Sequence, residues 1–199
     1  MKRYIVGMNS VFGVSLLVFL PLLAIGATPL ETIQTRVAKV LDVLRDPALK
    51  PDSAKEAKEK KIWAIAEEIF DFTELSKRTL GLAWKKLDAG QQREFIDLFS
   101  KILGSVYLDR IMAYTNEKVV FDKDSTLSED KAEVQSRVIT ASGEIPIKYM
   151  MINMNGNWRV YDVVIEGVSL VKNYRTQFRE LLKNQSPDDL LELLRKKAE

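Results

Sequence analysis

The chain contains no cysteine and no histidine. Without cysteine there is no disulfide framework, no thiol nucleophile and no lipid-anchoring cysteine for an exported chain. Without histidine, the commonest general base and the usual zinc ligand are missing too. The sequence also lacks a glycine-rich phosphate loop and a serine nucleophile elbow. We therefore consider carboxylate and tyrosine side chains as the candidates for catalysis.

Charge is nearly missing from the first 27 residues, where two basic residues precede an uncharged apolar run over residues 4–25. A basic start, an apolar centre and small residues at the end predict a signal peptide, cleaved near Gly26 or Ala27. The alternative is an uncleaved transmembrane anchor, because about 20 apolar residues span a bilayer. Glycine and proline within the run favour the cleaved leader. We therefore expect a signal peptide over residues 1–27 and a single domain over residues 28–199.

Neither sign of charge is in excess in the predicted domain. Of the 30 basic residues, two lie in the leader, which leaves 28 against 28 acidic residues and a formal net charge of zero. A nucleic-acid interface needs an excess of positive charge, so we expect no nucleic-acid partner. The 46% hydrophobic and 29% charged residues are typical of an ordinary globular domain.

Hydrophobic periodicity predicts helices in the first and last parts of the domain. Apolar residues recur at spacings of three and four, as on one face of an amphipathic helix. Most of these segments begin with a capping residue or an early proline. The predicted helices cover residues 29–45, 53–69, 72–80, 89–114, 168–183 and 187–194.

After Asn116 the spacing changes to two, which is typical of strands. The alternating positions predict four strands, around residues 119–121, 134–138, 145–151 and 158–164. Ser142-Gly143 and Asn155-Gly156 are short hairpin signals, so neighbouring strands should pair antiparallel. The order of elements predicts an α+β domain, with several helices covering one face of a four-stranded antiparallel sheet.

The stretch over residues 157–178 leads from the last strand into the next helix, and Gly167 allows the turn between them. Asp162 alternates with Val160 and Val164, so we expect these three side chains to point inward together. A buried acid needs a partner, which a neighbouring arginine or a backbone amide would supply. We interpret Asp162 as structural, with a catalytic role as the alternative.

Acidic residues between Asp122 and Asp130 superficially suggest a calcium loop. The segment lacks the spaced glycine and the closing glutamate of that motif, so a solvated hairpin loop is the better interpretation. No metal site and no cofactor are predicted.

Three segments resemble one known family. The stretch from Trp158 to Phe178, with its Tyr-Asp-Val, Glu-Gly-Val-Ser-Leu and Asn-Tyr-Arg groups, resembles the signature of the MlaC family. Phe70–Trp84 and Gln92–Phe99 are similar to that family's helical segments. The family consists of periplasmic phospholipid-binding proteins, also called toluene-tolerance auxiliary proteins, and the resemblance covers residues 30–194.

The resemblance implies a soluble periplasmic carrier that moves phospholipid between the outer and inner membranes and so maintains outer-membrane lipid asymmetry. Its implied partners are a phospholipid with two acyl chains, an inner-membrane ABC transporter complex and an outer-membrane lipoprotein–porin complex. It implies a monomer without catalytic residues, with an apolar cavity between sheet and helices.

Side chains on the sheet and on the facing helices are the candidates for lining this cavity. They are Phe95, Phe99, Leu103, Tyr107, Tyr149, Met151, Val160, Val164, Val168, Val171, Tyr174 and Phe178. Three polar residues of the signature, Asp162, Asn173 and Arg175, are expected to hold the shape of the strand-to-helix corner.

Two alternatives remain at this point. A related carrier would hold another lipid, such as a hopanoid, because nothing in the sequence specifies the headgroup. An enzyme on the same fold, an isomerase or hydrolase, would use Asp162 as base and Tyr161 or Tyr174 as acid.

Overall fold

The computed structural model describes residues 27–113 and 117–198. The predicted leader lies outside these residues except for Ala27, so the leader stays a prediction. No helix within the described residues is long and apolar enough to cross a membrane.

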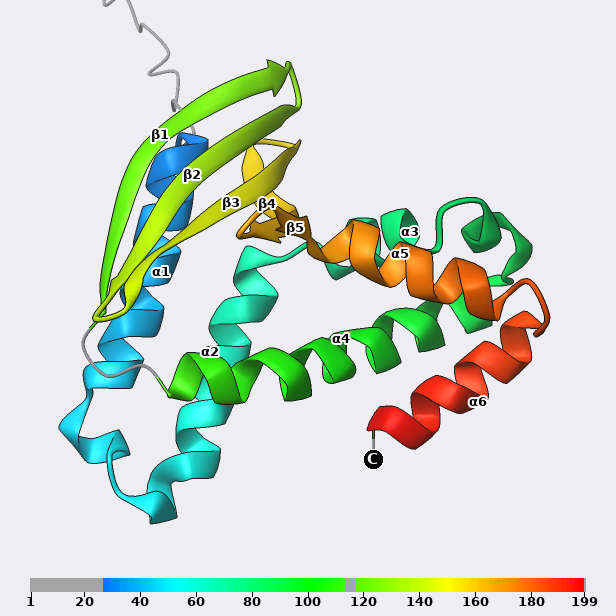
Figure 1. The fold of residues 1–199 in the computed structure, drawn as a ribbon, viewed down its shortest axis with the longest axis horizontal. Helices are drawn as coiled ribbons and strands as arrows, with labels where there is room; N and C mark the ends of the chain where they lie inside the picture. The colour runs from blue at the N-terminus through cyan, green and yellow to red at the C-terminus, as the bar shows by residue number, and fades with distance from the viewer. Residues whose placement is uncertain (1–26, 114–116, 199) are drawn as a thin grey trace, which may run out of the picture.

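Within the described residues, helices come first, a sheet follows and two helices end the chain (Figure 1). The α-helices are α1 (Pro29–Arg45), α2 (Lys55–Ile69), α3 (Phe72–Leu80), α4 (Ala89–Met112), α5 (Leu170–Leu181) and α6 (Pro187–Ala198). The strands are β1 (Lys118–Ser128), β2 (Lys131–Thr140), β3 (Gly143–Met154), β4 (Asn157–Ile165) and β5 (Val168–Ser169). The 3₁₀ helices are η1 (Pro47–Leu49), η2 (Asp52–Ala54) and η3 (Gly81–Lys86). The predicted α+β class with an antiparallel sheet is confirmed.

Local sequence explains where the helices begin. At the start of α1, the Thr28 hydroxyl accepts a hydrogen bond from the Glu31 amide (3.1 Å), and the Glu31 carboxylate accepts one from the Thr28 amide (2.9 Å). Asp88 and Gln91 form the same kind of capping box at the start of α4. Such boxes satisfy amides that have no partner inside the helix, so both starts lie where the sequence predicts them.

The sheet has the order β1-β2-β3-β4-β5, with a fifth strand that the sequence pattern did not predict. Glu166 and Gly167 both have a positive φ, of 49° and 83°, and form a two-residue turn that returns the chain along β4. Val168 therefore pairs with Ile165, and α5 begins at Leu170 rather than at Val168. The predicted helix start was wrong because the turn makes a hairpin before the helix begins.

A shift in the pairing of β3 with β4 corrects a second prediction. Val160 pairs with Met151, whereas Asp162 pairs with Met150, so β4 contains one extra residue at this point. An extra residue moves every following side chain to the opposite face of the sheet. Asp162 and Val164 therefore face the side opposite to Val160, and the predicted shared face of these three residues is wrong.

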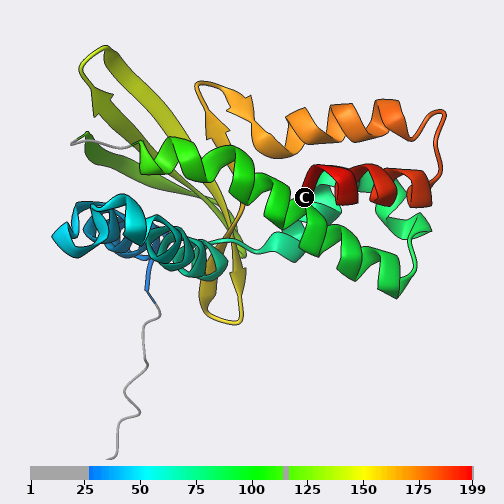
Figure 2. The ribbon, with the colours of Figure 1, turned by 90° about the horizontal axis from the view of Figure 1, so that it is seen from below.

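Two buried clusters divide the molecule into a sheet lobe and a helical lobe. The sheet lobe consists of α1 and β1–β5, and α1 packs on β1 and β2. The helical lobe consists of α3, η3, α4, α5 and α6. Figures 1 and 2 show the sheet with α1 towards one end of the molecule and most of the helical lobe towards the other, with α4 extending towards α2.

Candidate functional site

Four aromatic rings from α4 and α5 form the centre of the helical lobe. Phe95 and Phe99 are fully buried. The Phe99 ring lies 4.9 Å from that of Tyr174 and 5.5 Å from that of Phe178, both in edge-to-face geometry. Phe95 contacts Phe99 and Phe178 at 5.4 and 5.6 Å between ring centroids. Edge-to-face pairs at these distances are favourable, so the rings form a close-packed apolar core.

The structure places the predicted cavity residues in two clusters rather than one. The cluster of the helical lobe contains Phe95, Phe99, Leu103, Val171 and Phe178, with Tyr107 and Tyr174 packed against it. Met151 and Val160 belong to the cluster of the sheet lobe, with Tyr149 packed against it. Val164 is half-buried, and Val168 is 61% exposed on β5.

Phe70 connects the two clusters, because its side chain packs against both. The segment around it is bound to β4: the Asp71 amide donates to the Val160 carbonyl at 2.9 Å. The Arg159 guanidinium donates to the carbonyls of Glu67 and Phe70, both at 2.8 Å. Arg159 thereby satisfies carbonyls at the end of α2 that have no partner within the helix. The sequence contains no signal for this role of Arg159.

Asp162 holds the start of α5 against β4. Its carboxylate is buried and accepts hydrogen bonds from the Ser169 hydroxyl (2.6 Å) and the Val171 amide (3.0 Å). Ser169 in turn accepts from the Lys172 amide at 3.0 Å and so caps α5. A carboxylate at a helix N-terminus is stabilised by the free amides and the helix dipole. Both Asp162 oxygens are therefore engaged within the fold, as a structural role requires.

The other two polar residues of the signature, Asn173 and Arg175, are both exposed on α5. Arg175 donates from Nε to the Arg78 carbonyl at 2.7 Å and so ties α5 to the end of α3. Asn173 accepts a hydrogen bond from Gln177 at 3.3 Å, within its own helix. Arg175 thus links two helices, whereas this contact of Asn173 stays within α5.

Charged groups of α3 approach the sheet next to this corner. The Arg78 guanidinium lies 4.1 Å from the centroid of the Tyr161 ring and forms a salt bridge with Glu74. Burial opposes ionisation of the Glu74 carboxyl, but Lys77 and Arg78 outweigh that effect and lower its pKa. Burial raises the pKa of the Tyr161 hydroxyl.

The inner face of the sheet, where α1 packs, carries two neighbouring hydroxyl groups, those of Tyr149 and Ser136. Burial raises the pKa of Tyr149, and the neighbouring Ser136 hydroxyl opposes part of that rise. Tyr149 pairs with Val134 on one side and with Val163 on the other, and both partners belong to the buried sheet cluster. Tyr149 is therefore neutral at physiological pH and presents an aromatic ring to an apolar interior.

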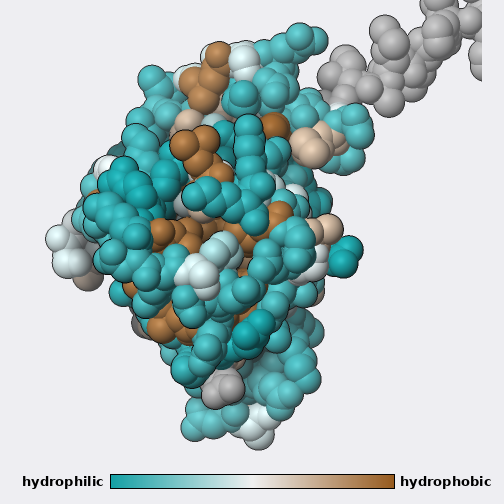
Figure 3. Space-filling model, turned by 90° about the vertical axis from the view of Figure 1, so that its right-hand side faces the viewer, coloured by the Kyte–Doolittle hydropathy of each residue, from teal (hydrophilic) through white to brown (hydrophobic). Residues whose placement is uncertain are grey.

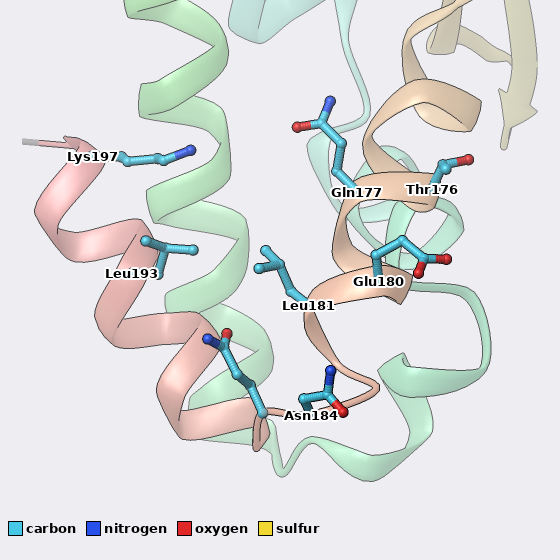
Figure 4. Close-up of a pocket in the computed structure, with 8 residues that line it drawn as sticks. Thr176, Gln177, Glu180, Leu181, Asn184, Leu193 and Lys197 are labelled. Atoms are coloured by element: carbon cyan, nitrogen blue, oxygen red, sulfur yellow. The ribbon is translucent and has the colours of Figure 1, made fainter.

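Two surface grooves lie away from the predicted cavity residues. A groove of about 590 Å³ runs between α5 and α6, and Figure 4 shows Leu181 and Leu193 on its two sides. It is lined by Thr176, Gln177, Glu180, Leu181, Asn184, Gln185, Leu193 and Lys197. A second groove, of about 630 Å³, lies between the start of α1 and the turn from β3 to β4. Neither groove includes a predicted cavity residue, so the cavity between sheet and helices stays a prediction.

A solved structure of a phospholipid-binding protein from Ralstonia solanacearum, in complex with a phospholipid, superimposes with a TM-score of 0.75 at 22% identity. The superposition covers 86% of this chain and 97% of that one. At this identity the likeness concerns the fold.

Relatives are also found by sequence. The toluene tolerance protein ttg2D of Pseudomonas putida is 25% identical over 176 residues, 87% of this chain and 82% of that protein. The intermembrane phospholipid transport system binding protein MlaC of Haemophilus influenzae is 26% identical over 126 residues. The aligned residues make up 61% of this chain and 59% of the Haemophilus protein. The family model for the MlaC protein matches residues 34–196, which is most of the chain. The chain therefore belongs to the MlaC family.

Proposed function

We propose that this protein is a periplasmic phospholipid carrier that shuttles lipid between the outer and inner membranes and maintains outer-membrane lipid asymmetry. The observation that carries the proposal is the family match over residues 34–196. Two relatives named for phospholipid transport and toluene tolerance support it, as does the shared fold with a phospholipid-bound protein.

A carrier of this kind must shield two acyl chains from water. About 30 CH₂ groups at about 0.8 kcal/mol each would cost on the order of 20 kcal/mol if exposed. The charged headgroup has the opposite preference and stays in water. The carrier therefore needs a deep apolar slot with an open mouth, and no catalytic group.

The slot lies between the two lobes in this proposal. Apart from Val164 and Val168, the predicted lining residues divide between the helical cluster and the sheet cluster, so acyl chains that contact both sets must pass between them. Tyr107 on α4 and Tyr149 on β3 are half-buried members of the two sets. Phe70, which packs against both clusters, marks the junction.

An inner-membrane ABC transporter complex and an outer-membrane lipoprotein–porin complex are the proposed partners. The chain acts between them as a monomer after its signal peptide is removed. An enzyme with Asp162 as base is not favoured, since both carboxylate oxygens already bond to Ser169 and Val171.

Native mass spectrometry with lipid extraction of the mature protein tests the proposal. We expect one two-chain phospholipid per protein. Met151 and Met154 provide a matched pair on β3, because Met151 is fully buried in the sheet cluster and Met154 is exposed at the strand end. Met151→Asp should abolish lipid loading, because a buried carboxylate opposes acyl chains, and Met154→Asp should leave it unchanged.

Folding must be verified separately, because a charge in a core can unfold a domain. Tyr107→Asp, at a half-buried site on α4, gives a second variant with a smaller risk of unfolding. A folded wild-type protein that contains no lipid, and takes none up from vesicles, would contradict the carrier function.

A further inference from the structure

The turn at the far end of the helical lobe carries an unusually exposed leucine. Leu82, in η3, is 84% exposed, whereas its neighbours Ala83 and Trp84 pack against the helical cluster. This end of the lobe lies away from the sheet in Figures 1 and 2, and Figure 3 faces it, with hydrophobic residues visible among hydrophilic ones. A single exposed leucine is common on protein surfaces, so its surroundings decide whether it has a function.

Two lysines follow Leu82 in η3. Side chains three residues apart lie on the same side of a 3₁₀ helix, so Lys85 lies beside Leu82, and Lys86 follows it. Both lysines are exposed, and neither forms a salt bridge with any residue that the structure describes. The patch therefore combines one apolar side chain with two unneutralised positive charges.

The backbone under this patch is held in place. The Gln92 side-chain amide donates to the carbonyls of Trp84 (3.1 Å) and Leu87 (3.2 Å). Gly81 begins the turn with a φ of 58°, which allows the sharp change of direction after α3. A preformed turn loses little conformational freedom when it contacts a surface, which favours binding.

We propose that Leu82, Lys85 and Lys86 form a docking patch for an anionic phospholipid surface. Leu82 inserts at the boundary between headgroups and acyl chains, while the two ammonium groups lie at the phosphates. One leucine and two lysines give weak and reversible attachment, as a protein that leaves the membrane again requires. A partner protein with an acidic and apolar surface is the competing occupant, and the experiment decides between them.

Vesicle co-sedimentation of the mature protein tests the patch. We expect binding to vesicles that contain phosphatidylglycerol, little binding to phosphatidylcholine vesicles, and a decrease as salt is added. Leu82→Ser should reduce the partition coefficient about tenfold. Replacing both lysines with glutamine (K85Q and K86Q) should reduce it roughly 25-fold, at about fivefold per lysine.

Matched controls separate the patch from general surface effects. Leu127 is 52% exposed on β1, with Glu129 and Asp130 close by in the sequence, so Leu127→Ser should bind like the wild type. Lys55 and Lys60 each pair with a glutamate on α2, so replacing both with glutamine removes the same net charge elsewhere. This second control should retain most of the binding.

Equal binding of the wild type to neutral and anionic vesicles, no binding to either, or wild-type binding by Leu82→Ser overturns the docking patch. The patch does not depend on the proposed slot, because none of its residues belongs to the predicted lining. Lipid extraction of the same samples distinguishes the two proposals. Absence of copurified lipid would contradict the carrier function, whereas vesicle binding tests only the docking patch.

Discussion

The helical lobe and the sheet lobe bury their apolar residues in different ways. Twelve buried residues form the helical cluster, and three of them are phenylalanines in mutual ring contact. Five buried residues without an aromatic ring form the sheet cluster, and its aromatic side chains pack against it in part-buried positions. Interlocked rings leave little freedom to shift, because a packed interior resists any change in volume. The smaller cluster on the sheet has fewer neighbours to disturb. We therefore expect the helical cluster to tolerate truncation of a side chain less well than the sheet cluster does.

Truncating the aromatic centre should have the largest effect. Phe99→Ala removes a fully buried ring that contacts Phe95, Tyr174 and Phe178, and should lower the free energy of unfolding by about 3–5 kcal/mol. Urea denaturation measures this change in the free energy of unfolding. A loss near 1 kcal/mol would mean that the rings repack and that the helical lobe is the adaptable one.

A matched pair of aliphatic truncations compares the lobes directly. Leu75 in the helical cluster and Ile33 in the sheet cluster are each 1% exposed. Leu75→Ala should cost about 3–5 kcal/mol and Ile33→Ala about 2–3 kcal/mol, because the smaller cluster leaves a smaller unfilled cavity. Equal losses by denaturation of both variants would remove the proposed difference between the lobes.

The next largest loss of stability is expected at the corner that joins β4 to α5. Asp162→Asn keeps the size of the side chain but loses the charge that binds the Ser169 hydroxyl and the Val171 amide. We expect a loss of about 1.5–3 kcal/mol, since hydrogen bonds to charged groups contribute that much. Lipid loading should persist in the folded variant, and its disappearance would assign Asp162 to the slot itself.

The smallest effect should come from the ion pairs of α3 and should depend on pH. The pKa of Glu74 lies below its ordinary value of 4.5, because Lys77 and Arg78 outweigh burial. A lowered folded-state pKa gives stability that is present above the unfolded pKa and is lost as the pH falls through the folded pKa. Glu74→Gln should therefore cost about 0.5–1 kcal/mol at pH 7 and almost nothing near pH 2. A pH-independent difference between the variant and the wild type would point to packing instead.

Most of the fold could be predicted from local sequence patterns, because capping and turn formation depend on residues a few positions apart. Capping residues mark helix starts by satisfying free amides, as Thr28 and Asp88 do. Asn155-Gly156 forms the predicted hairpin turn, with φ of 54° and 89°. The errors concern strand β5 and the bulge in β4, where one residue in the pairing register changes the face of every residue that follows.

The candidate site was less accessible to sequence reasoning. Periodicity identified residues that are buried, but it could not say in which of two interiors each one lies. Val160 and Phe99 are predicted to line opposite walls of one cavity, and in the structure they belong to different buried clusters. Arg159 gave no signal, because its role is to bind carbonyls of a helix end far away in the sequence.

By itself the sequence determined the α+β class, the capped starts of α1 and α4 and the turn at Asn155-Gly156. These depend on contacts between residues a few positions apart, and the MlaC signature also lies in one continuous stretch. Only the tertiary structure decided the division into two lobes, the position of Phe70 between them and the hydrogen bond from the Val171 amide at the start of α5 to Asp162. These features arise from contacts between distant segments, whose partners are set by pairing register and by the packing of whole elements.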